Sequence, residues 1–206
     1  KRKHTWIMCW LYLGTFGSFI GYSAGFPLLI KSQFPQINAL SYAWLGPLVG
    51  ALIRPLGGWM SDKLGGAQVS FWNFVAMAFG VLGVLYFLPQ GGEGGNFYGF
   101  LVMFMLLFTT AGVGNGSTFR MIPVLFLNQH QRAAAGKGRE AEEQAVRDAN
   151  KEAAAVLGFS SAIGAYGGFF IPMSYSISIS MFGGPAYALY LFIVFYLTCI
   201  AMTWWY

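Results

Sequence analysis

The sequence predicts an all-α integral membrane protein with six transmembrane helices. Hydrophobic residues make up 56% of the 206 residues and charged residues only 9%, whereas a soluble domain carries about 25% charged residues. The apolar residues fall into runs of about 20 or more, which is the length that an α-helix needs to cross the hydrocarbon core of a bilayer. We therefore expect a lipid bilayer to surround most of the chain.

Six apolar runs are long enough to span a membrane. They cover about residues 6–30, 41–60, 69–88, 98–127, 153–182 and 185–205. The first run, of about 25 residues, exceeds the apolar core of about 7–15 residues in a signal peptide, so we expect it to be a spanning helix. We expect residues 1–206 to form one transmembrane domain. The start at Lys1 rather than at a methionine predicts that the chain begins inside a longer protein.

The long connection between the fourth and fifth runs, residues 128–152, has a different composition. It is rich in Ala, Glu and Arg, which favour helices, and Arg139, Glu143 and Arg147 follow i,i+4 spacing that stabilises a helix in water. This pattern predicts a solvated loop-helix. A partner-binding site is the alternative interpretation of the same charges.

Basic residues lie almost entirely on one side of the predicted spans. Lys31 is alone on its side, and nine basic residues share the other: Lys1, Arg2, Lys3, Lys63, Arg132, Lys137, Arg139, Arg147 and Lys151. Because Lys and Arg collect on the cytoplasmic side of membrane proteins, both ends of the chain are expected in the cytoplasm. The net charge of +5 is thereby explained without a nucleic-acid partner.

Arg54 lies inside the second apolar run, where a charge costs about 2.5–3.5 kcal/mol on insertion scales. It shares an i,i+4 face with Gly46, Gly50 and Gly58, which suits a packed interior or a cavity better than a lipid-facing stripe. The six runs contain no Asp or Glu, so Arg54 has no carboxylate partner within them. A guanidinium fork in this setting favours a flat oxyanion. The alternative is that Arg54 extends its side chain to the interface.

Arg120 is a second basic residue within a run, about two turns before Asn128. It too is close enough to the interface for its charge to reach water. Asn115 and Ser117 match a glycosylation sequon, but this motif lies inside a predicted span, so we disregard it.

The connection after the second run resembles the cytoplasmic loop signature of the major facilitator superfamily. Gly58, Asp62, Lys63 and Gly65 match that signature, while Gly66 replaces its final basic residue. The resemblance implies that this loop forms a cytoplasmic gate, which couples two conformations.

A closer resemblance is to the nitrate/nitrite porter family of the NarK type, also within this superfamily. It rests on GALIRPLGGWMSDKLGG at 50–66, AGVGNGSTFRMI at 111–122 and GFSSAIGAYGGFFIP at 158–172. Such transporters have twelve helices in two halves, with the substrate held between the halves. The resemblance implies that this chain is the C-terminal six-helix half, located in a bacterial inner membrane, and that its partner is the missing N-terminal half.

The resemblance also assigns roles to single residues. It implies that Arg54 binds the anionic substrate, that Tyr12, Phe16 and Phe119 line the anion site, and that Ser161 and Gly164 belong to a glycine-rich helix beside it. Arg120 occupies a position where the family is expected to have a neutral polar residue.

The expected function is exchange of nitrate and nitrite by alternating access. The alternative is a proton-coupled symporter of nitrate or another small solute, which commonly uses an Asp, Glu or His inside the membrane. A membrane enzyme or cofactor carrier is the third possibility. It is disfavoured because the runs contain no histidine and the chain has no phosphate-binding loop. We therefore expect no catalytic residue, metal or cofactor.

Overall fold

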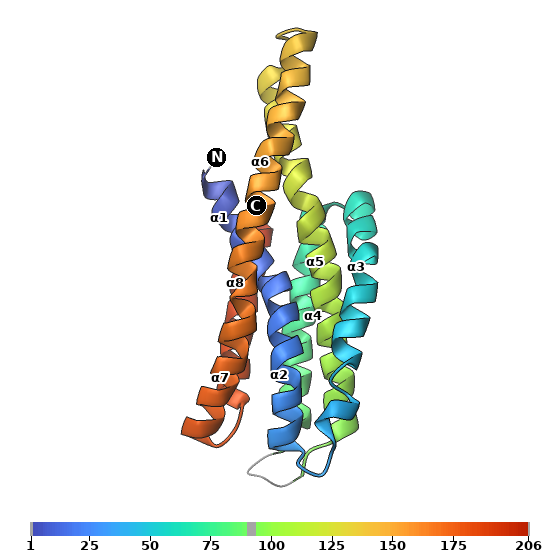
Figure 1. Ribbon diagram of the computed structural model, residues 1–206, viewed down its shortest axis with the longest axis vertical. Coiled ribbons are helices and arrows are strands. Elements are labelled where there is room, and N and C mark those ends of the chain that lie inside the picture. The colour runs from blue at the N-terminus through green and yellow to red at the C-terminus, as the bar shows by residue number, and fades with distance from the viewer. Residues whose placement is uncertain (1, 90–93, 206) are drawn as a thin grey trace.

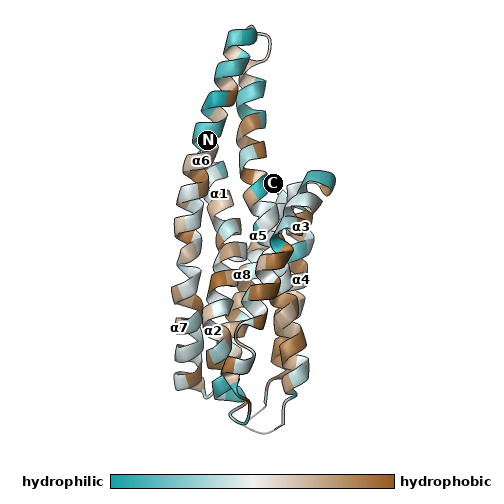
Figure 2. Cartoon of the chain, turned by 45° about the vertical axis from the view of Figure 1, so that its right-hand side comes forward, coloured by the Kyte–Doolittle hydropathy of each residue, from teal (hydrophilic) through white to brown (hydrophobic). Residues whose placement is uncertain are grey.

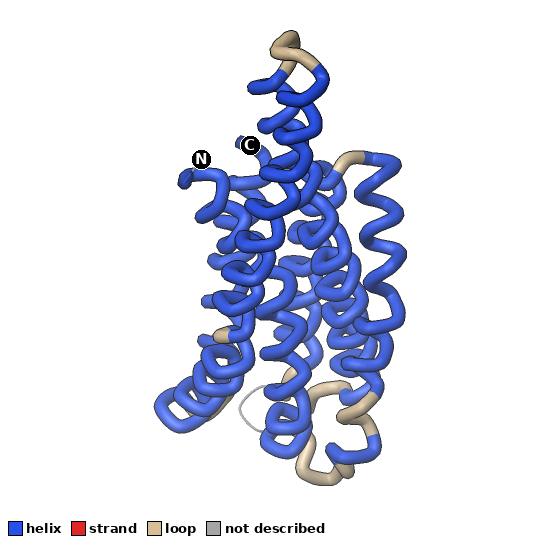
Figure 3. Tube along the Cα trace, turned by 45° about the horizontal axis from the view of Figure 1, so that its top comes forward, coloured by secondary structure: helices blue, strands red, loops and turns tan. Residues whose placement is uncertain are grey.

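The computed structural model describes residues 2–89 and 94–205. Lys1, which belongs to the predicted basic terminus, and Glu93, in a predicted loop, lie outside these ranges. The described chain is a bundle of long helices joined by short turns (Figure 3). In chain order the helical elements are α1 (Arg2–Tyr12), the π-helical turn η1 (Leu13–Gly17), α2 (Ser18–Gln33), the 3₁₀ turn η2 (Ala39–Ser41), α3 (Leu45–Leu64), α4 (Gly66–Phe87), α5 (Phe97–Ala134), α6 (Arg139–Ala165), α7 (Gly167–Phe182) and α8 (Ala186–Trp205).

Within the described residues, six helical segments are long and apolar enough to cross a membrane. Each overlaps one of the six predicted runs, and three of them are interrupted; the second includes η2 and a short turn before α3 begins at Leu45. The first passes through η1, which has the wider winding of a π-helix. The fifth is divided at Tyr166, where α6 ends and α7 begins.

Residues 128–152 form more helix than the sequence predicted. α5 continues to Ala134 and α6 begins at Arg139, so the turn between them is short. Gly136 and Gly138 have φ angles of 77° and 98°, a region that side chains disfavour. The two helices project together beyond the bundle (Figure 1), and the projecting part is mainly hydrophilic (Figure 2). Both ends of the chain lie toward this side of the bundle, and α2 ends at the opposite side.

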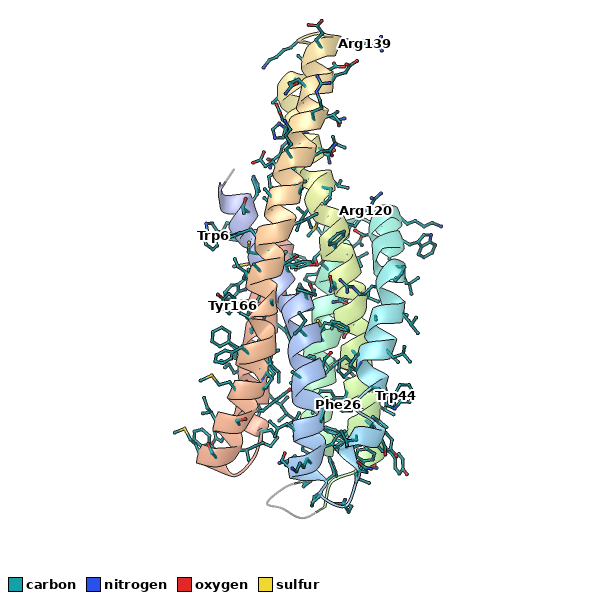
Figure 4. The ribbon with its side chains drawn as sticks, in the orientation of Figure 1. Trp6, Phe26, Trp44, Arg120, Arg139 and Tyr166 are labelled. Carbon is teal, nitrogen blue, oxygen red and sulfur yellow. The ribbon has the colours of Figure 1, made fainter. Side chains whose placement is uncertain are left out.

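Aromatic side chains fill the interior between α2 and α5. Phe26 contacts three rings that follow one another on a face of α5, with centroids 6.1 Å, 4.9 Å and 5.8 Å away at Phe100, Phe104 and Phe108. All four side chains are fully buried, and Figure 4 shows Phe26 within the bundle. Trp6 and Tyr166 are both 61% exposed and point outward in the same view, as apolar side chains do when lipid surrounds them.

α3 packs against α5 through its glycines. A Cβ atom at Gly46 would collide with the Phe108 ring, and one at Gly57 would collide with the backbone of Val113. Small residues allow two helix backbones to approach closely within a membrane. The opposite side of α3 carries exposed leucines, including Leu52 at 73% exposure. The close approach places the Arg54 turn of α3 directly beside α5.

Candidate substrate-binding site

Arg54 is half-buried on α3, and its guanidinium lies near two aromatic rings. The central guanidinium carbon is 5.9 Å from the centre of the Phe16 ring and 5.8 Å from that of Phe19. Both distances fall within the range of cation–π attraction. Among the described residues, three ion pairs form, and none of them involves Arg54. The rings therefore stabilise this cation without neutralising it.

The π-helical turn η1 positions the aromatic part of the site. Tyr12 directly precedes the turn and Phe16 lies within it, with ring centroids 5.2 Å apart. The wider turn brings Gly14 against the Phe74 ring and Gly17 against the carbonyl oxygen of Gly164. Turns of this kind occur often at functional sites. Here the two glycines allow the turn to fit between neighbouring helices while the aromatic rings face Arg54.

The glycine-rich helix α6 closes this group on another side. Ser161 lies near the hydroxyl of Tyr12, which also lies within electrostatic range of Arg54. A Cβ atom at Gly164 would lie 2.8 Å from the Phe16 ring and 3.4 Å from the Tyr12 ring. The structure therefore brings together Arg54 and four of the residues predicted to accompany it.

Phe119 lines a cavity together with Arg54. It is 49% exposed on α5, and this cavity of about 350 Å³ is lined by residues of both α5 and α3. The lining residues of this cavity are Ala51, Arg54, Pro55, Gly58, Asn115, Gly116, Phe119 and Arg120. Arg54 thus lies near aromatic rings from η1 and α2 and also borders an open cavity.

Residues of the predicted gate motif surround the turn between α3 and α4. Asp62 accepts a hydrogen bond from Nε of Arg120 at 2.7 Å, which joins α3 to α5. The Lys63 ammonium lies 4.3 Å from the centre of the Trp59 ring. Gly65 has a φ angle of 90° and ends α3. A Cβ atom at Gly58 would meet only the Gly116 carbonyl oxygen, at 3.8 Å, so packing in this conformation does not require that glycine.

Some residues of this region were missed by sequence reasoning. Phe19 was one apolar residue among many, and only the folded chain places it over Arg54. Gly57 lies beside the predicted glycine face and makes a tighter contact with α5 than Gly58 does. Asn115 was noticed only as part of a sequon, although an amide inside an apolar run is itself a signal.

The described residues contain no group of three or more His, Cys, Asp or Glu side chains arranged to hold a metal ion. The chemistry available at the site comes from the guanidinium of Arg54, that of Arg120, which is paired with Asp62, aromatic rings, hydroxyls and an amide.

No family model matches the chain, but several known proteins are similar to it. The nitrate/nitrite transporter NarU of Escherichia coli K12 is 49% identical over 205 residues, which are 99% of this chain and 44% of that protein. NarU of Salmonella typhimurium LT2 gives the same values. A probable nitrate/nitrite antiporter of Thermus thermophilus, NarK2, is 36% identical over 211 residues, which cover 100% of this chain and 42% of that protein.

Six helices long and apolar enough to cross a membrane, together with this similarity to membrane transport proteins about twice as long, define the chain as a helical membrane domain of about half their size. The chain spans less than half the length of the relatives described above. Over nearly its whole length the chain is similar to nitrate/nitrite transporters and a probable antiporter of the NarU and NarK2 kind. It is a multi-pass bacterial membrane protein, and its relatives are named as transporters and not as enzymes.

Proposed function

We propose that this chain is the C-terminal half of a transporter that exchanges nitrate and nitrite across a bacterial inner membrane by alternating access. The observation that carries the proposal is the surroundings of Arg54. Its guanidinium is half-buried, faces two phenyl rings and borders a cavity, and it has no ion-pair partner among the described residues. A cation held in this way can bind an anion from outside the chain.

The other side chains fit a small planar anion. A guanidinium fork can donate two parallel hydrogen bonds to two oxygens of one oxyanion. In our proposal the rings of Tyr12, Phe16 and Phe119 face the flat sides of the anion, and Ser161 lies near the Tyr12 hydroxyl. The absence of a Cβ atom at Gly164 leaves room for the Phe16 ring beside it. The names of the relatives supply the substrates, nitrate and nitrite.

The site is completed, in this proposal, by an N-terminal six-helix half. The relatives are long enough to contain a second half of this size, and transporters of the major facilitator superfamily bind substrate between their two halves. We place both ends of this chain in the cytoplasm because of the basic residues on that side. The gate motif with Gly58, Asp62, Lys63 and Gly65 then lies at the cytoplasmic end of the site.

Exchange is favoured over proton symport by the positions of the ionisable groups. The six predicted spans contain no Asp, Glu or His, so this half offers no proton-carrying side chain near Arg54. Without an anion, the uncompensated charge of Arg54 disfavours closure around the site. A bound anion neutralises that charge and stabilises the closed intermediate, so the loaded carrier changes conformation more readily than the empty one.

Liposomes containing the complete transporter, that is, this chain joined to its N-terminal half, test the proposal. Vesicles loaded with nitrite are expected to take up external nitrate rapidly, and vesicles without a permeant anion are expected to take it up slowly. A pH gradient imposed on the second set should not restore uptake. Uptake driven by the pH gradient would instead establish the symport alternative, with the proton carrier in the N-terminal half.

A further inference from the structure

Asn115 on α5 is a fully buried side chain without a hydrogen-bond partner. It is 0% exposed, and neither its Nδ2 nor its Oδ1 atom forms a hydrogen bond within the described chain. Leaving a buried polar group unpaired costs about 1–3 kcal/mol. Most buried polar groups are paired in folded proteins, and an exception calls for an explanation.

Other polar side chains near Asn115 form hydrogen bonds within the chain. The Thr118 hydroxyl, one turn further along α5, bonds to the Gly114 carbonyl at 2.8 Å and to the Thr15 hydroxyl at 3.0 Å. Ser117 bonds to the Ser70 hydroxyl at 3.2 Å. The fold thus pairs the polar groups that join α5 to its neighbours, and the amide of Asn115 is not used in that way.

Asn115 lies at the cavity that borders Arg54. Both residues line it, together with Phe119. The neighbouring residue on α5, Gly116, packs so closely on α3 that a Cβ atom there would collide with the carbonyl oxygen of Arg54 itself. The backbone of α5 at this point therefore lies beside the helical turn that carries the guanidinium, and Asn115 and Arg54 border the same cavity.

We propose that Asn115 is a specificity residue of the anion site, which donates a hydrogen bond from its Nδ2 to the third oxygen of bound nitrate. This inference rests on the proposed function. The fork of Arg54 engages two oxygens of a planar oxyanion. Nitrate has a third oxygen that needs a separate donor, whereas nitrite has only two. The unpaired amide supplies that donor, so it favours nitrate over nitrite.

A purely structural role for Asn115 makes a different prediction. If the amide only maintained the packing of α5 against α3, its loss would displace Arg54 and weaken the binding of both anions to a similar extent. If it contacts the third oxygen, its loss weakens nitrate binding selectively. The ratio of the two affinities therefore separates the two roles, whereas the affinity for one anion does not.

The test is calorimetric titration of the purified complete transporter with nitrate and with nitrite. Asn115→Leu preserves the approximate size of the side chain and removes its donor. We expect nitrate binding to weaken roughly ten- to hundredfold, as for the loss of a hydrogen bond to a charged group, and nitrite binding to change by less than about threefold. Asn115→Ser, which leaves more room and retains a shorter donor, should give a smaller loss with the same selectivity.

Asn73→Leu is the matched control. Asn73 is also a buried asparagine, 6% exposed on α4, but it donates to the Met77 sulfur and lines a different cavity. It should leave the affinity ratio unchanged. Equal affinities in Asn115→Leu and the unmodified protein, or an equal loss for both anions, would overturn this inference alone. Failure of the unmodified transporter to bind either anion would overturn the proposed function and the inference with it.

Discussion

The guanidinium carbon of Arg54 lies 5.9 Å from the centre of the Phe16 ring, which joins the buried charge of α3 to the π-helical turn of the first span. Phe19 approaches the same carbon to 5.8 Å. Each such contact stabilises a cation by about 0.5–2 kcal/mol, depending on its exposure to solvent. The rings thus hold the charge in place while leaving its hydrogen-bond donors available to an anion.

The first prediction concerns the shape of the cation at position 54. Arg54→Lys keeps the positive charge but loses the planar fork, so we expect nitrate exchange by the complete transporter to fall at least about tenfold, as for the loss of one hydrogen bond to a charged group. Exchange is measured in nitrite-loaded liposomes with equal amounts of protein. Arg139→Lys, at a side chain that is 92% exposed on the projecting helices, is the control and should exchange normally. Normal exchange by Arg54→Lys would remove the substrate-binding role of Arg54.

The second prediction concerns the neighbouring hydroxyls of Tyr12 and Ser161, which we expect to form a hydrogen bond when the anion is bound. Tyr12→Phe and Ser161→Ala each remove one hydroxyl of the pair, so each should weaken nitrate binding several-fold. Because the two residues act as one unit, the double variant should bind nitrate about as well as either single variant, with a coupling energy of about 0.5–3 kcal/mol. Tyr190→Phe, at an exposed position on α8, is the control for loss of a hydroxyl. Additive losses in the double variant would show that the pair does not act together.

The third prediction concerns the packing of η1 against the start of α7. A Cβ atom at Gly167 would collide with the backbone of Gly17, whereas a Cβ atom at Gly158 on α6 would meet nothing within 4 Å. We therefore expect Gly167→Ala to lower the free energy of unfolding by about 1–3 kcal/mol, as overpacking does. Gly158→Ala should be neutral or stabilising, because alanine favours a helix interior. Thermal unfolding of the detergent-solubilised protein compares the two variants, and equal midpoints would contradict the close contact.

Some features of the fold and the site follow from local sequence and could be predicted. Others depend on contacts between helices and could not. The six spans follow from run length and composition, which are local properties. Arg54 and its glycine face could be recognised because helical periodicity places i,i+4 residues together. The position of Phe19 over Arg54 depends on how η1 and α2 pack against α3. The unpaired state of Asn115 likewise depends on contacts between helices far apart in the sequence.

The extent of the helices around residues 128–152 was underestimated for a related reason. The charged residues there predicted a solvated helix, and the side chain of Arg139 is 92% exposed. They did not reveal that α5 and α6 continue past the apolar runs and contact each other there. His130 on α5 and Glu152 on α6 are 2.7 Å apart, and this contact across 22 residues of sequence cannot be read from periodicity.

The last prediction concerns the ion pair between Asp62 and Arg120, which joins the end of α3 to α5 at 2.7 Å. Their side chains are 48% and 56% exposed, so solvent screens the pair and its contribution to stability is small. That contribution is too small to decide whether the protein folds, but it changes a local equilibrium up to about fivefold. Asp62→Asn should therefore accelerate amide hydrogen exchange in the last turn of α3 by up to about fivefold, while exchange in α8 stays unchanged. The double variant Asp62→Arg with Arg120→Asp re-creates the pair in reverse and should restore slow exchange, whereas Asp62→Arg alone places two cations together and should exchange fastest. Glu143→Gln breaks an exposed ion pair elsewhere, that of Arg139, and should leave α3 unaffected. If amide hydrogen exchange in the last turn of α3 were as fast in the reversed pair as in Asp62→Arg alone, the ion pair would not hold the end of α3 against α5. The glycine contacts between α3 and α5 would then hold it.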